Sequence, residues 1–74
     1  MTQKHKEYLL SRARVFFGMG KGALDETSFH LASAWLQDIV NEFNAAGLPI
    51  FAGYVNDYII DLEKMGPLYK RLQK

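Results

Sequence analysis

Apolar side chains recur at steps of three and four residues through most of this 74-residue chain. That spacing matches one face of an α-helix, whereas a half-buried strand would alternate apolar and polar residues. No useful length of the sequence alternates in that way. The clearest helical stripe consists of Phe29, Ala32, Leu36, Ile39, Val40 and Phe43. The periodicity therefore predicts an all-α fold.

We expect a three-helix bundle with a short fourth helical segment at its C-terminal end. The predicted helices lie near residues 2–17, 25–46 and 50–65, within a single domain of residues 1–74. Thr2 is a good N-cap for the first helix, and Asp25 or Thr27 for the second. Gly47 suits the position just after a helix, and Pro49 suits the first turn of the next helix.

The first and third helices also carry apolar stripes that predict their buried faces. The residues of these stripes are Leu9, Leu10, Ala13, Phe16 and Phe17, then Phe51, Val55, Tyr58, Leu62 and Met65. Gly53 interrupts the third helix and costs it about 1 kcal/mol relative to alanine. We expect this glycine to mark a place where another helix passes close by. After Gly66, we expect Leu68, Tyr69 and Leu72 to fold back onto the bundle.

The stretch FFGMGKGALD, residues 16–25, places three glycines around a lysine. A phosphate-binding P-loop needs GxxxxGK followed by Ser or Thr, between a strand and a helix. Here the glycine spacing differs, Ala23 follows the last glycine, and the preceding segment is helical in pattern. We therefore predict that the first helix ends before Gly18 and that residues 18–22 form a flexible hinge, which leaves open whether the first helix packs in its own chain or crosses to another.

The chain contains no cysteine, which excludes disulfides and thiolate zinc sites. Its apolar runs are far shorter than the roughly 20 residues of a membrane-spanning helix. Polar residues such as Arg12 interrupt the apolar stretch that follows the basic N-terminus, unlike a secretory signal. These features predict a cytoplasmic protein.

No motif for catalysis or cofactor binding is present. Glu26 and His30 stand four residues apart, which places both on one helix face, but a metal site needs more than two ligands. The serines lack the setting of an activated nucleophile. A domain of this size also has little room for a ligand pocket. We predict no enzyme activity, no metal, no cofactor and no small-molecule substrate.

Some apolar side chains fall outside the predicted buried faces. They are Tyr8, Val15, Leu31, Trp35 and Ile60. Single exposed apolar residues are common, and Trp35 could also close one end of the core. However, one tryptophan, four tyrosines and five phenylalanines are many for short helices, and small domains often gain missing burial by oligomerising. We therefore predict a non-enzymatic interaction or regulatory protein that self-associates, as a homodimer for example, or docks on a protein partner.

Charge is segregated along the sequence. The chain is basic up to Gly22, carries seven acids and no Lys or Arg in residues 23–63, and is basic again to its end. Such an acidic middle could meet a basic partner or the basic end of a second copy.

Nucleic-acid binding is the alternative hypothesis. If the C-terminal segment folds beside the first helix, one basic patch could form from Lys4, Lys6, Arg12, Arg14, Lys70, Arg71 and Lys74. Phosphate contacts need such a patch. Against this, the third helix carries Asp57, Asp61 and Glu63, which would repel phosphates lining a groove.

The segment EYLLSRAR, Glu7 to Arg14, is similar to the start of the small bacterial haemolysin-expression-modulating proteins. That similarity implies a helical protein of like length that acts by joining nucleoid proteins. It covers eight residues, and the rest of the chain departs from that family's pattern. Small helical immunity, antitoxin and phage or plasmid accessory proteins share the same general character.

Overall fold

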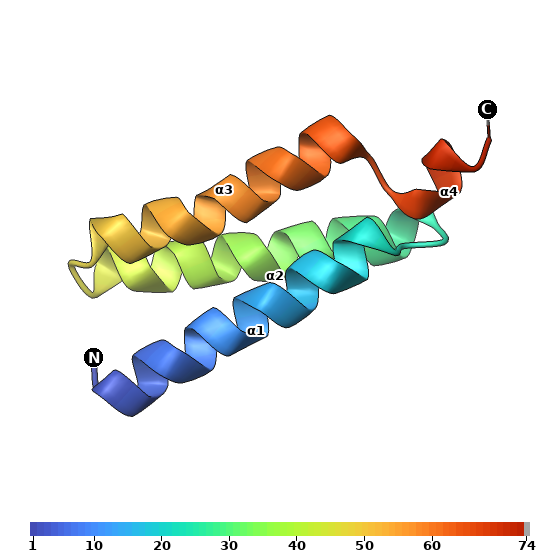
Figure 1. The fold of residues 1–74 in the computed structure, drawn as a ribbon. Coiled ribbons are helices and arrows are strands. Elements are labelled where there is room, and N and C mark those ends of the chain that lie inside the picture. Colours follow the sequence, from blue (N-terminus) through green and yellow to red (C-terminus); the bar gives the residue numbers. More distant parts are fainter. Residues whose placement is uncertain (74) are drawn as a thin grey trace.

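The computed structural model describes residues 1–73, and these residues are all-α. The helices are α1 (Gln3–Lys21), α2 (Glu26–Ala45), α3 (Pro49–Met65) and α4 (Leu68–Arg71). The three long helices lie side by side, and the short α4 lies at the end where α1 meets α2 (Figure 1). The molecule is elongated, with extents of 44 × 18 × 14 Å. The predicted three-helix bundle with a short fourth segment is confirmed.

Two helices begin at the side-chain caps that the sequence indicates. The Thr2 hydroxyl accepts a hydrogen bond of 3.1 Å from the His5 backbone N–H at the start of α1. At the start of α2, the Asp25 carboxylate accepts one of 2.7 Å from the Ser28 N–H. This bond stabilises the ionised carboxylate and lowers the pKa of Asp25. Both caps satisfy N–H groups that have no partner within the helix.

Glycine and proline set the ends of α2 and α3. Gly47 follows α2 with φ of 73°, and Gly66 follows α3 with φ of 75°. Only glycine enters this left-handed region without a steric penalty from a Cβ atom. Pro49 occupies the first turn of α3, where its missing N–H loses no helical hydrogen bond. These boundaries agree with those predicted from the sequence.

The predicted end of the first helix is wrong. The structure continues α1 beyond Phe17 as far as Lys21, and its C-cap is Gly22. The segment 18–22 is therefore not a hinge, because most of it is helical. Gly22 donates its backbone N–H to the Gly18 carbonyl at 3.1 Å, which closes the last turn.

Gly20 explains why the helix continues through glycines. This residue is buried, and a Cβ atom built on it would lie 2.8 Å from Leu62 Cδ1 of α3 and 3.5 Å from Ala32 Cβ of α2. The missing side chain thus lets α1 approach both other helices. The same role was predicted for Gly53. That prediction is wrong, since among residues 1–73 no atom of another helix comes within 4 Å of a Cβ placed there.

The core is formed by the three predicted stripes. Its buried members are Leu9, Ala13, Phe16, Leu36, Ile39, Val40, Phe43, Ala52, Val55 and Leu62. Phe43 and Leu36 are completely buried. Met65 differs from its predicted place, because it lies exposed in the last turn of α3, while Ala52 joins the core instead.

The C-terminal segment folds back onto the end of α1. The Tyr69 backbone N–H donates to the Ala23 carbonyl at 3.1 Å, and the Arg71 guanidinium donates to the Lys21 carbonyl. Leu68 and Tyr69 are half-buried as expected, whereas Leu72 is exposed, contrary to the prediction. Across residues 1–73, we find no helix with both the length and the apolar character needed to cross a membrane.

Candidate protein-interaction surface

Helices α1 and α2 together present a row of exposed side chains, which we name the α1/α2 face. Residues at steps of three and four lie on the same side of a helix. The face consists of Lys4, Tyr8, Arg12, Val15 and Met19 on α1, with Leu31, Trp35, Asp38 and Glu42 on α2, all of them exposed. It lies on the side of each helix that borders the other helix.

Two contacts establish how the helices are paired along this face. The His5 Nε2 atom lies 2.8 Å from Glu42 Oε1 near the start of α1. Further along, the Phe16 and Trp35 rings pack with their centroids 4.9 Å apart. The helices therefore run antiparallel, with Met19 about level with Leu31.

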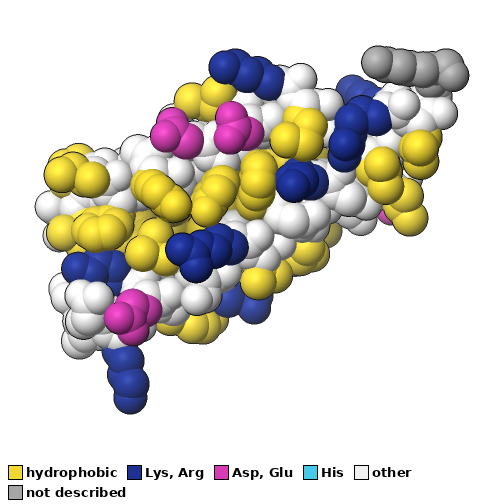
Figure 2. Space-filling model, viewed as in Figure 1, with side chains coloured by type: hydrophobic (Ala, Val, Ile, Leu, Met, Phe, Trp, Pro, Cys, Tyr) yellow, Lys and Arg dark blue, Asp and Glu magenta, His cyan; other side chains and the backbone are white. Residues whose placement is uncertain are grey.

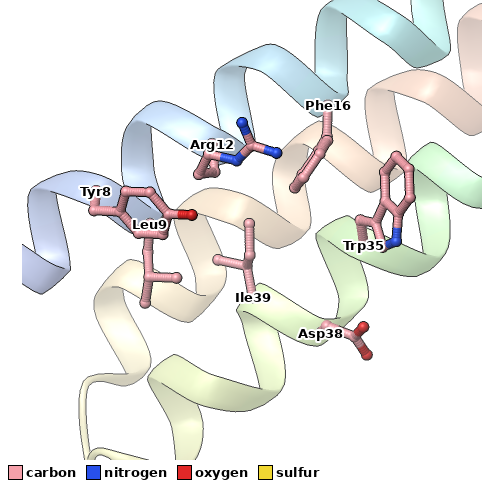
Figure 3. Close-up of a pocket in the computed structure, with 7 residues that line it drawn as sticks. All are labelled: Tyr8, Leu9, Arg12, Phe16, Trp35, Asp38 and Ile39. Carbon is pink, nitrogen blue, oxygen red and sulfur yellow. The ribbon is translucent and has the colours of Figure 1, made fainter.

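A shallow hollow of about 220 Å³ lies in the middle of the face (Figure 3). Its lining residues are Tyr8, Leu9, Arg12, Phe16, Trp35, Asp38 and Ile39. The Arg12 guanidinium lies over the Phe16 ring at 4.8 Å from its centroid. In Figure 3 the Ile39 side chain reaches between the helices, while the Asp38 carboxylate points away from them. The hollow is thus apolar at its base and charged at its rim.

Four of the five predicted contact residues belong to this face. Tyr8 is 57% exposed, Val15 50%, Leu31 46% and Trp35 38%. None of these side chains is enclosed by the folded chain. Ile60 is 39% exposed but lies on α3, so the structure does not bring it together with the others.

Sequence reasoning missed Met19 as a member of the face. The side chain is 45% exposed and stands four residues after Val15 on α1. Its spacing already fits the row, but the predicted hinge removed it from the helix. Recognising that α1 continues through Gly18 would have placed Met19 correctly.

The charges of the face are divided between its two helices. Lys4 and Arg12 lie on α1, while Asp38 and Glu42 lie on α2. Neither Arg12 nor Asp38 forms an ion pair with another of residues 1–73. One half of the face is therefore basic along one edge and acidic along the other.

The other side of α1 borders α3 and is packed with the chain's own aromatic rings. Phe17 stacks on Tyr58 with centroids 4.7 Å apart, and the Lys21 ammonium lies 5.3 Å from the Phe17 centroid. Lys6 lies over Phe51 at 4.9 Å. Figure 2 views this side and shows a hydrophobic band between the helices with Lys and Arg side chains beside it.

Tyr58 is a half-buried titratable side chain on the α1/α3 side. Burial raises its pKa, and the neighbouring Tyr54 acts in the same direction, whereas Arg14 acts in the opposite one. The Tyr54 and Tyr58 rings pack edge to face at 5.7 Å. The aromatic rings on this side thus pack against one another and against nearby Lys side chains.

The predicted single basic patch does not form. Arg71 contacts Lys21 at the C-terminal end of α1, which is the end where the chain's C-terminal segment lies. Lys4 and Lys6 lie near the other end of α1, about 25 Å away at 1.5 Å per helical residue. Lys4, Lys6, Arg12, Arg14, Lys70 and Arg71 are therefore spread along the molecule, and Lys74 lies outside the described residues.

In residues 1–73, Glu26 and His30 are not joined by a third side chain that could bind a metal ion. His30 Nε2 lies 3.4 Å from Glu26 Oε1, as their spacing implies. In residues 1–73, no three His, Asp or Glu side chains are grouped to hold a metal ion.

A second hollow of about 350 Å³ lies between α2 and α3. It is lined by Val40, Asn44, Pro49, Ala52, Gly53 and Asn56. The open space at Gly53 is part of this hollow.

Comparison of the chain with family models, with curated proteins and with solved structures gave no match. The eight-residue similarity of Glu7–Arg14 therefore transfers no function to this protein.

Proposed function

We propose that this chain is a small non-enzymatic interaction module, cytoplasmic and regulatory in role, that docks its α1/α2 face on a protein. The partner is either a second copy or a different chain. The observation that carries the proposal is the exposure of Trp35 and Leu31, one turn apart on α2, at 38% and 46%. Tryptophan is enriched at the energetic centres of protein interfaces.

The neighbours of Trp35 add to this support. Val15 and Met19 are exposed on α1 at about the level of Trp35 and Leu31 on α2, and Tyr8 is exposed further along α1, beyond Arg12. A contiguous apolar area rimmed by charge is typical of a protein-binding surface, whereas scattered single residues are not. The proposal therefore rests on the shared face and level of these side chains rather than on their number.

The test combines sedimentation of the chain at micromolar concentration with capture of partner proteins from the native host. We expect self-association or capture, and we expect Trp35→Ala and Leu31→Ala to reduce it. Ile60→Ala is the matched control, because Ile60 is 39% exposed but lies off the face. A strict monomer whose partner capture is unchanged in both variants would contradict the proposal.

Nucleic-acid binding stays the alternative hypothesis, and the spread of the basic residues along the molecule disfavours it. A gel-shift titration at two salt concentrations separates the two functions. Binding through phosphate contacts weakens steeply as salt rises, whereas docking of an apolar face does not.

A further inference from the structure

We propose that the partner of the α1/α2 face is a second copy of this chain, related to the first by a twofold axis parallel to α1 and α2. This inference rests on the proposed function and specifies its partner. It follows from how apolar and charged side chains are distributed over the face.

Along the helices, the face divides into two halves. The half near the α1–α2 connection is apolar and contains Val15, Met19, Leu31 and Trp35. The half near the start of α1 holds the charged side chains Lys4, Arg12, Asp38 and Glu42, together with Tyr8. A partner must therefore present apolar side chains opposite the apolar half and charged side chains opposite the charged half.

Across the helices, the charged half divides again. The bases lie on α1 and the acids on α2. A face with opposite charges along its two edges is complementary to its own copy when each edge meets the other edge. Isologous twofold interfaces require this kind of self-complementarity.

An axis parallel to the helices satisfies both conditions. It leaves positions along the helices unchanged, so the apolar half meets the apolar half of the second copy. It also exchanges the two edges, so that α1 lies on α2 of the second copy. Arg12 then approaches Asp38 of the second copy, Lys4 approaches its Glu42, and the same pairs recur by symmetry.

An axis across the helices fails the same conditions. It would place α1 against α1, and thus bring Arg12 and Lys4 near the basic edge of the other copy. The parallel axis instead makes every neighbouring pair of helices antiparallel. That is the arrangement of an up-down-up-down four-helix bundle.

Cysteine pairing tests the arrangement directly, because the chain has no cysteine of its own. Full-length Met19→Cys is mixed with full-length Leu31→Cys and oxidised, and the disulfide-linked products are identified by mass. We expect the mixed product to dominate, since Met19 of one copy lies over Leu31 of the other. Predominant linking of Met19→Cys to itself would overturn the proposal, because that product requires α1 against α1.

Charge reversal supplies a second, independent measurement. We expect Arg12→Glu and Asp38→Arg each to weaken dimerisation about tenfold at low salt, since each converts two attractive pairs into repulsive ones. The double variant should recover most of that loss. Circular dichroism of each variant verifies that the helices are retained. Unchanged dimerisation in both single variants would overturn the proposed pairing.

A monomer in sedimentation at about 100 µM overturns this inference by itself, because no useful self-association remains at that concentration. The proposed function has a separate criterion, which is the effect of Trp35→Ala on capture of a different protein. The two failures are therefore distinguishable.

Discussion

The two sides of helix α1 carry similar side chains but differ in how far the rest of the chain covers them. On the α3 side, Phe17 is half-buried and stacks on Tyr58, and Lys21 lies over it. On the α2 side, the Trp35 ring touches Phe16 and still exposes 38% of its surface. Aromatic rings with nearby cations are thus present on both sides.

The difference lies in which helices contribute the exposed apolar side chains. On the α3 side, Tyr54 and Met65 are exposed beside the half-buried Tyr58, and all three belong to α3. On the α2 side, α1 contributes Val15 and Met19. Leu31 and Trp35 are exposed on α2. The proposed interaction surface is thus the side of α1 on which both paired helices leave apolar side chains exposed.

The largest expected effect on stability comes from removing an aromatic ring on the α1/α3 side. We expect Phe17→Ala to lower the free energy of unfolding by about 2–3 kcal/mol, because it removes a half-buried ring that stacks on Tyr58. Val15→Ala, two residues earlier on the exposed side, should change it by no more than about 0.5 kcal/mol. Urea unfolding at low chain concentration measures both values. If both variants lost the same free energy of unfolding, Phe17 would be no better packed than Val15, and the comparison of the two sides of α1 would fail.

Two glycine substitutions test how closely α1 approaches α3. Alanine gains helix propensity at both Gly20 and Gly53, by less at Gly20 because it stands in the last turn of α1. A difference well beyond about 1 kcal/mol between the two variants therefore reports the packing around them. We expect Gly53→Ala to be stabilising and Gly20→Ala to be less stable than it by about 2 kcal/mol, since the new methyl group would overlap the buried Leu62. Thermal unfolding compares the two variants. If Gly20→Ala is as stable as Gly53→Ala, α1 does not pack closely on α3 at Gly20.

A smaller effect is expected from removing a cation on the α1/α3 side. Lys21→Met should lower the free energy of unfolding by about 0.5–1 kcal/mol, the contribution of an exposed cation over a ring. Lys64→Met is the control, because Lys64 also stands in the last turn of its helix and has no aromatic ring beneath it among the described residues. Chemical denaturation gives both values. Equal effects would show that net charge, and not the ring contact, accounts for the change.

The smallest expected effect concerns how the stability of the fold depends on pH through the cap of α2. This helix carries Leu31 and Trp35 of the α1/α2 face. The pKa of Asp25 is lowered in the folded chain by the Ser28 N–H, so the cap stabilises the fold above the pKa of about 3.9 found in unfolded chains. That contribution is lost as the pH falls through the lower folded-state pKa. Asp25→Asn should show a weaker decline of stability with acid, followed by circular dichroism between neutral and acidic pH. An identical acid profile would exclude this cap as a source of the pH dependence.

Local features of the sequence predicted most of the fold. Thr2 and Asp25 indicate where helices begin, and Gly47 and Gly66 indicate where helices end. These signals can be recognised in the sequence because capping involves only residues a few positions apart. The apolar stripe of α2 likewise identified its buried residues without knowledge of any neighbour. Four residues of the α1/α2 face were predicted for the same reason, since helical spacing alone places them outside the core.

The local signals failed where long-range packing decided the outcome. Gly18 and Gly20 each disfavour a helix by about 1 kcal/mol, yet α1 continues through both and ends only at Gly22. The bare Gly20 backbone allows α1 to pack closely against Leu62. The sequence also could not show that Ile60 lies apart from Trp35 in the folded chain, since helical spacing relates residues only within one helix.

The sequence by itself determined that the chain is helical, where most helices begin and end, and which stripe of each is buried. These properties depend on backbone hydrogen bonds and side-chain spacing within a few residues. Only the tertiary structure decided that α1 extends to Lys21 and that Trp35, Leu31, Val15 and Met19 form one surface. Those outcomes depend on how the buried stripes of separate helices fit together, which brings residues distant in the sequence to the same place.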